Sequence, residues 1–108
     1  LAGRNRGALE ALGRETGLPV RVFGLGEPAA VAAGLRGMTV VLHCAGPFST
    51  TAAPMLQGCL AAGVHYTDIT GEIDVFAGCH ARDAEARARG ICVLPGAAKP
   101  AIAYSGPT

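Results

Sequence analysis

Tryptophan is absent from this 108-residue chain, and aromatic residues make up only 5% of it. An excess of either charge is also lacking, because nine basic and eight acidic residues leave a formal net charge of +1. Proteins that bind nucleic acid through its phosphates usually carry a marked basic excess, so we predict no nucleic-acid partner. No apolar run approaches the roughly 20 residues that a spanning helix needs, and we predict no membrane-spanning segment.

The four cysteines include no Cys-x-x-Cys pair and no spacing that fits known zinc sites. His43 precedes Cys44, but neighbouring residues on a strand point to opposite faces and rarely bind one ion together. We therefore predict no metal site. The N-terminus does not resemble a signal peptide, so we predict a cytoplasmic protein with reduced, mostly buried thiols. Cys44 is expected to lie buried in a strand, which disfavours a reactive thiolate.

Half of the residues are hydrophobic, which is enough for one core of modest size. Asn5 can cap a helix that Gly17 ends, and short β-branched runs alternate with apolar helical patterns along the rest of the chain. The sequence predicts strands at residues 20–23, 39–44, 64–69 and 91–94. It predicts helices at residues 6–16, 28–35, about 49–62, and 72–89.

This alternation of strand and helix is typical of an α/β fold with a doubly wound, Rossmann-like parallel sheet. Residues 39–44 form a continuous apolar run, which predicts burial on both faces with helices above and below. Along the last helix, five residues spaced three and four apart, four of them apolar or small, are expected to form its packed face. They are Ile73, Phe76, His80, Ala84 and Ala88.

Three short blocks follow or end predicted strands, at the sheet edge where open α/β proteins hold a dinucleotide. The blocks are Ala2-Gly3-Arg4, Ala45-Gly46-Pro47-Phe48 and His65-Tyr66-Thr67-Asp68-Ile69-Thr70-Gly71-Glu72. Over about residues 1–96, their order and separation resemble the NADP-binding domain of saccharopine dehydrogenase-like oxidoreductases. The resemblance implies NADP as cofactor, hydride transfer, and a small-molecule or acyl substrate. It makes residues 1–96 a partial dinucleotide-binding domain. Residues 97–108 show no clear hydrophobic period, which predicts an irregular tail.

The first block supplies a cation just beyond a strand, where a guanidinium can pair with the 2′-phosphate of NADP. NAD-dependent proteins tend to carry a carboxylate at this place. The resemblance therefore assigns Gly3, Arg4 and Asn5 to the cofactor site. The alternative is that Arg4 and Arg6 form an exposed helix start, where a cation is slightly unfavourable near the positive end of the helix dipole.

The second block consists mainly of small residues, as expected of a loop that approaches a cofactor backbone-first. The resemblance places Ala45, Gly46, Pro47 and Phe48 along the ribose and nicotinamide half of NADP. The alternative is an ordinary Gly-Pro turn with Phe48 anchored in the core. The family commonly has asparagine near His43, so this histidine is a departure from its pattern.

The third block offers substrate-side candidates, namely Tyr66, Asp68, Gly71 and Glu72. The alternative is that Asp68 or Thr70 caps the following helix and that Glu72 lies in its first turn, where acids are favoured. No catalytic residue stands out. No Ser-His-Asp order and no paired carboxylates indicate a hydrolase.

The Gly-x-x-Gly-x-x-Gly loop of the family, and the strand before it, have no counterpart in the sequence. We therefore expect an incomplete sheet, split where that central strand would stand, and a fragment that is inactive alone. Exposed strand edges favour self-association. An alternative function follows from the same feature: a non-catalytic α/β module that binds another chain through its open strand edges.

Overall fold

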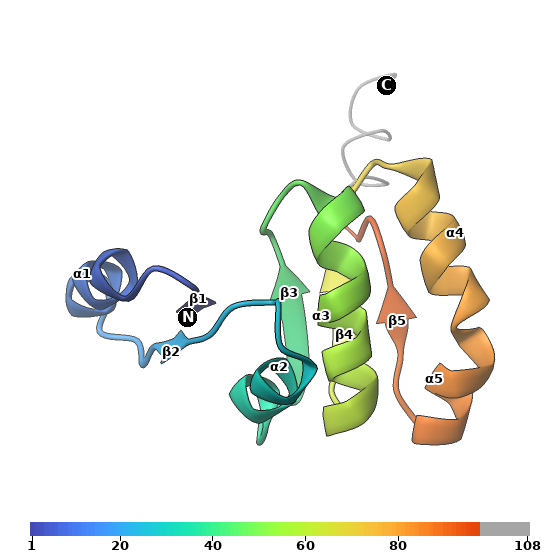
Figure 1. The fold of residues 1–108 in the computed structure, drawn as a ribbon, viewed down its shortest axis with the longest axis horizontal. Coiled ribbons are helices and arrows are strands. Elements are labelled where there is room, and N and C mark those ends of the chain that lie inside the picture. Colours follow the sequence, from blue (N-terminus) through green and yellow to red (C-terminus); the bar gives the residue numbers. More distant parts are fainter. Residues whose placement is uncertain (98–108) are drawn as a thin grey trace, which may run out of the picture.

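The computed structural model describes residues 1–97 as an α/β arrangement with two parallel sheets (Figure 1). Its strands are β1 (Ala2–Gly3), β2 (Arg21–Val22), β3 (Val40–His43), β4 (His65–Asp68) and β5 (Val93–Leu94). Its helices are α1 (Arg6–Thr16), α2 (Pro28–Leu35), α3 (Phe48–Ala62), α4 (Ile73–Ala81) and α5 (Asp83–Arg89). No helix among these residues is both long and apolar enough to cross a membrane. Apart from Ala97, the predicted irregular tail lies outside the described residues.

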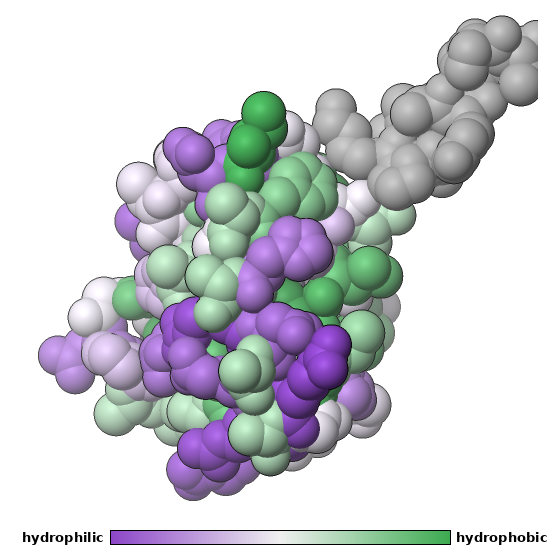
Figure 2. Space-filling view, turned by 90° about the vertical axis from the view of Figure 1, so that its right-hand side faces the viewer, coloured by the Kyte–Doolittle hydropathy of each residue, from purple (hydrophilic) through white to green (hydrophobic). Residues whose placement is uncertain are grey.

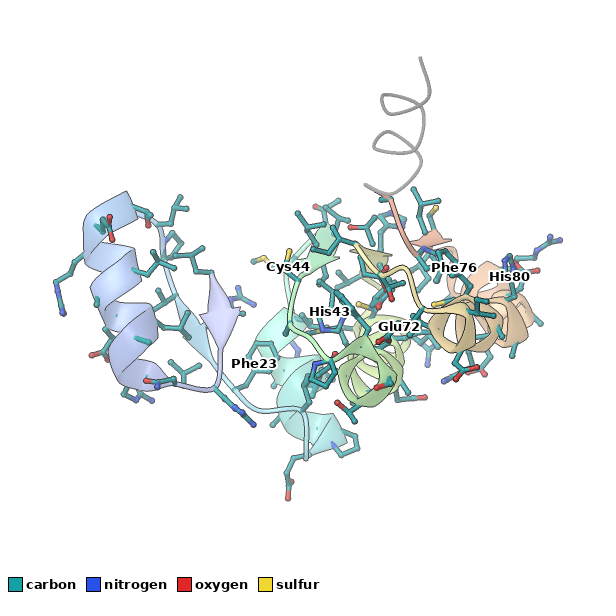
Figure 3. The ribbon with its side chains drawn as sticks, turned by 90° about the horizontal axis from the view of Figure 1, so that it is seen from above. Phe23, His43, Cys44, Glu72, Phe76 and His80 are labelled. Atoms are coloured by element: carbon teal, nitrogen blue, oxygen red, sulfur yellow. The ribbon has the colours of Figure 1, made fainter. Side chains whose placement is uncertain are left out.

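The larger sheet has the order β3-β4-β5, with every pair of neighbours parallel. Figures 1 and 3 show α3 and α4 over one of its faces. Side chains on that face alternate with exposed ones, so Tyr66 and Asp68 are fully buried. One apolar cluster fills the space between this face and the helices. It comprises Val31, Leu35, Ala52, Met55, Leu56, Cys59, Leu60, Val64, Tyr66, Val75, Cys79, Ala86 and Ile91.

The opposite face of the sheet is largely bare. Val40 and Leu42 of β3 are 52% and 64% exposed, and Leu94 of β5 is 52% exposed. Leu42, Thr67 and Leu94 are paired across the three strands and therefore form one row. The prediction that residues 39–44 are buried on both faces is thus wrong for the described residues. A continuous apolar run indicates that a strand is suited to burial on both faces. The helices described here cover only one face of β3.

The smaller sheet is formed by β1 and β2, which pair in parallel beside α1 (Figure 1). It lies on the β3 side of the larger sheet, and no strand of residues 1–97 joins β1 to β3. Two contacts attach this unit to α2. The Arg21 guanidinium donates to the carbonyls of Gly34 and Arg36 over 2.8 and 2.6 Å, at the negative end of the helix dipole. The ring of Phe23 packs over Gly34.

Helix boundaries follow the expected local signals. The side chain of Asn5 accepts from the amide of Ala8 at 3.0 Å and caps α1. Gly17, Gly63 and Gly90 end α1, α3 and α5 in the left-handed conformation, with φ near 70°. These residues confirm the predicted ends of the helices. Because α3 begins at Phe48, Pro54 lies in its second turn.

The single helix predicted for residues 72–89 is divided at Arg82 into α4 and α5. The predicted packed face was wrong: Ile73 is 82% exposed and His80 is exposed, whereas Val75, Cys79 and Ala86 are buried. Residues 73–89 carry two apolar stripes, one with Ile73 and His80 as predicted and one with Val75 and Cys79. The second stripe is the one that packs against α3. Figure 2 shows hydrophilic and hydrophobic side chains mixed on the side of the molecule that carries α4 and α5.

Candidate functional site

The carboxyl ends of β3 and β4 bring two of the three predicted blocks together. His43, the last residue of β3, pairs in register with Asp68, the last residue of β4. The loop of residues 44–47 then leads from β3 into α3, and residues 69–72 lead from β4 into α4. Figure 3 views the sheet from this end, with His43, Cys44 and Glu72 labelled. We call this end of the two strands, with both loops, the strand-end site.

A buried chain of hydrogen bonds runs through the strand-end site. The Tyr66 hydroxyl donates to Asp68 Oδ2 over 2.5 Å, and His43 Nδ1 lies 3.3 Å from the same hydroxyl oxygen. The other carboxylate oxygen, Oδ1, accepts from the amides of Thr70 and Gly96 over 3.0 and 2.7 Å. Asp68 therefore holds the loop after β4, the turn after β5 and the Tyr66 side chain in one arrangement.

Asp68 does not cap α4, so the alternative interpretation of Asp68 as a helix cap is wrong. Glu72 is the residue before the helix, and its side chain makes no capping hydrogen bond. The Thr70 hydroxyl instead accepts from the Glu72 amide at 3.1 Å. Gly71 and Glu72 are exposed at the strand-end site, which leaves them accessible to a ligand.

Burial shifts the pKa values of His43 and Tyr66, the two ring side chains of this hydrogen-bonded network. Loss of solvent lowers the pKa of His43 from its usual value of 6.5, and the Asp68 carboxylate opposes that shift. Burial also raises the pKa of Tyr66, helped by its hydrogen bond to Asp68. At neutral pH the site therefore holds a neutral imidazole and a neutral phenol.

The loop of the second block is exposed at Ala45, Gly46 and Pro47, whereas Phe48 is half-buried. The Phe48 ring packs edge-on against His43, with 5.3 Å between ring centroids. The Thr51 hydroxyl donates to the Ala45 carbonyl over 2.6 Å and fixes the loop to α3. Gly46 has no positive φ, and a Cβ built on it meets no atom within 4 Å. Neither the backbone conformation nor the packing of these residues requires glycine here.

The first block lies apart from the other two. Gly3 accepts from the amide of Phe23 and packs beneath Leu9, while Asn5 caps α1. Arg4 is exposed immediately after β1. Within residues 1–97, no hydrogen bond or ion pair links Gly3, Arg4 or Asn5 to the loop of residues 44–47.

The four cysteines are free thiols, but only two are buried. Burial raises the pKa of Cys59 to about 12 and that of Cys79 to about 11, so both stay protonated at neutral pH. Cys44 is exposed, contrary to prediction, because β3 ends one residue before it. Among residues 1–97, no cluster of three or more histidine, cysteine or acidic side chains is arranged to hold a metal ion.

His43 is the functional candidate that the sequence did not single out. Its side chain is buried on the same covered face as Tyr66 and Asp68, because His43 is paired with Asp68 and paired residues of neighbouring strands share a face. The sequence offered one signal for this site. Tyr66 and Asp68 are spaced by two on one strand, and His43 ends the neighbouring strand. Only the register of β3 against β4 shows that these three residues meet.

Comparison with protein-family models, curated proteins and solved structures finds no match to this chain. The resemblance to saccharopine dehydrogenase-like oxidoreductases therefore stays a prediction.

The lowered pKa of His43 predicts a pH-dependent stability. Between the folded pKa and 6.5 the unfolded chain takes up a proton that the folded chain does not, so the free energy of unfolding falls as the pH falls through this window. Urea unfolding at pH 7.5, 6.5 and 5.5 measures this slope. We expect His43→Gln, which cannot titrate, to have a shallower slope. An equal slope in the two proteins would contradict the assignment.

Proposed function

We propose that residues 1–96 are part of the NADP-binding domain of an oxidoreductase that transfers hydride to or from a small-molecule or acyl substrate in the cytoplasm. The observation that carries this proposal is the open loop at the strand-end site. A glycine that neither backbone nor packing requires is explained if a ligand approaches the loop at Gly46. The carboxyl edge of a parallel sheet is where such ligands bind in open α/β proteins.

The arrangement of the two sheets supports the hypothesis of a Rossmann-like fold. One further strand between β1 and β3 would give the order β2-β1-strand-β3-β4-β5. This is the order 3-2-1-4-5-6 of dinucleotide-binding domains, in which the first strand is central. The glycine-rich loop that follows that strand would supply the pyrophosphate site. Without it we expect weak NADP binding and no turnover by these 108 residues.

Each block then has a separate task. Arg4, exposed after β1, pairs with the 2′-phosphate, while Gly3 and Asn5 shape the strand end around it. Residues 45–48 support the ribose and nicotinamide, and the bound cofactor would donate the hydride in its reduced form or accept it in its oxidised form. Tyr66 and Asp68 hold the loops in place, because both are buried beneath the site. Gly71 and Glu72 face the substrate from the exposed loop after β4.

Chemical-shift mapping tests this assignment at the low affinity expected. Titration of the ¹⁵N-labelled 108-residue chain with NADP into the millimolar range should move the amides of residues 3–5 and of residues 44–46 and 48. Residues of α5 should not move and serve as the internal control. Saturable shifts confined to α5, or none in either block, would contradict NADP binding.

Arg4→Ala should weaken NADP binding about tenfold, because it removes a charge-assisted pair with the 2′-phosphate. NAD, which lacks that phosphate, should bind the variant and the unaltered chain equally. Arg14→Ala is the matched control, since Arg14 is an exposed cation at the other end of α1. The same loss for both nucleotides would refute the specific role of Arg4.

A non-catalytic module that binds another chain is the second candidate function. The exposed side chains of Val40 and Leu42 on β3 favour it, as do the edges of β1 and β3 that pair with no strand within residues 1–97. Size-exclusion chromatography with light scattering separates the two functions. A defined dimer without nucleotide affinity would support the module, whereas a nucleotide-binding monomer would support the NADP-binding domain.

A further inference from the structure

The helices α3 and α4 lie side by side over the sheet and leave a groove between them (Figures 1 and 3). The groove has a volume of about 370 Å³, and its floor contains Leu56, Val75 and Cys79, which are buried. Gly78 of α4 is exposed at its rim, where a Cβ would meet no atom within 4 Å. The groove is therefore an apolar hollow that opens to solvent beside Gly78.

The surface around this groove carries very little charge. None of the 15 residues of α3 is acidic or basic, although Ser49, Ala53 and Gln57 are exposed on it. A helix whose outer face meets water normally carries charged side chains on that face. The centre of a protein interface is depleted of charge instead. The composition of α3 is thus typical of a helix whose outer face is covered by another molecule.

Two opposite charges mark the ends of the groove. Asp74 lies in the first turn of α4 and Arg82 directly follows the helix, so each is four residues from Gly78. The Asp74 carboxylate is exposed and forms no ion pair within residues 1–97. Arg82 bonds to Glu85 and Gln57 through Nε and Nη2, which leaves Nη1 without a partner among these residues. Each charge can therefore bind an opposite charge from another molecule.

These charges make the surface complementary to itself. Residues spaced by four share one stripe of a helix, so Asp74 and Arg82 lie about 12 Å apart along the stripe that contains Gly78. A two-fold axis at Gly78 places a second α4 antiparallel to the first, and each Asp74 then faces the Arg82 of the other copy. Glycine at the axis lets the two helix backbones approach closely. One surface thus supplies both halves of the complementary pair.

We propose that this surface is the interface of a symmetric dimer, in which α3 and α4 pack against the same two helices of a second copy of this chain. The other copy covers the groove, and Asp74 of each copy pairs with Arg82 of the other. The proposal is independent of NADP binding, and it uses neither the bare face of the sheet nor the edge of β3. A contact between short helices is small for an interface, so we expect a Kd of roughly 100 µM. By mass action the chain is then monomeric at about 1 µM.

Sedimentation equilibrium of the 108-residue chain, from about 10 µM to about 1 mM, tests the dimer. Asp74→Arg should raise the Kd at least roughly tenfold, because it places like charges at both ends of the groove. Gly78→Gln should have a similar effect, because a long side chain at the axis separates the two helices. The matched controls are Glu15→Arg and Gly7→Gln, which make the same changes at exposed positions of α1. Both controls should keep the Kd of the unaltered chain.

Mixing two charge-reversed variants tests the pairing itself. Asp74→Arg and Arg82→Glu should each fail to form a homodimer, because positions 74 and 82 then carry like charges. An equimolar mixture should form a heterodimer with a Kd within about threefold of the unaltered value, since both pairs are then of opposite charge. Circular dichroism verifies that each variant is folded. If Arg82→Glu does not fold without its bond to Glu85, the results for Asp74→Arg and Gly78→Gln decide the question.

The rival explanations give different results. A dimer that persists in Asp74→Arg and Gly78→Gln but is lost in Leu42→Lys would overturn the proposal and assign the association to the bare face of the sheet. A chain that stays monomeric at about 1 mM would also overturn it and leave the groove to an occupant other than a second copy. Two folded charge-reversed variants that form no heterodimer would refute the pairing of Asp74 with Arg82.

Discussion

Replacing Asp68 by alanine should lower the free energy of unfolding by roughly 3–5 kcal/mol. The carboxylate is fully buried and accepts from three donors, namely the Tyr66 hydroxyl and the amides of Thr70 and Gly96. Alanine leaves the two amides without an acceptor in a region that water does not reach, and it leaves the Tyr66 hydroxyl with His43 Nδ1 as its one remaining neighbour for a hydrogen bond. Since domains of this size are stable by about 5–15 kcal/mol, the loss is a large part of the total.

Urea unfolding followed by circular dichroism measures this effect. Asp74→Ala is the matched control, because Asp74 is an exposed carboxylate in the first turn of α4, and its loss should cost less than about 1 kcal/mol. Asp68→Asn should lie between the two, since it keeps the acceptor for both amides. A stability of Asp68→Ala within 1 kcal/mol of the unaltered chain would show that the buried network is not structural.

Local signals in the sequence were sufficient for most element boundaries. Asn5 and Gly17 delimit α1 because a capping side chain and a left-handed glycine act within one turn of the chain. The break at Arg82 could not be predicted in the same way. At this break the Arg82 guanidinium contacts Gln57 on α3, a residue distant in sequence, as well as Glu85, and no local pattern indicates such a contact.

The candidate site was predicted only in part for a related reason. Tyr66 and Asp68 could be assigned to the end of a strand from the apolar pattern around them. Their joint action with His43 depends on the parallel register of β3 and β4, which no local pattern specifies. Exposure of Val40 and Leu42 was equally beyond prediction, because burial of a strand face depends on which elements reach it.

Gly58→Ala should destabilise the protein by about 1–3 kcal/mol, although alanine is the better helix former. Gly58 lies within α3 at its closest approach to α2, and a Cβ built there collides with the side chain of Val31. Val31 is completely buried, and its β-branched side chain has little rotamer freedom. The two helices would have to separate, which would loosen the contacts of Leu35 with α3.

Gly78→Ala is the matched control, and the opposite sign is expected for it. Gly78 also lies inside a helix, α4, but a Cβ there meets no atom within 4 Å. With no collision to oppose it, the gain in helix propensity should raise the free energy of unfolding by about 0.5–1 kcal/mol. Thermal unfolding of the two variants at one pH measures both signs. A stabilised Gly58→Ala variant would mean that α2 and α3 do not pack as closely as the structure has them, because helix propensity alone then outweighs the contact with Val31.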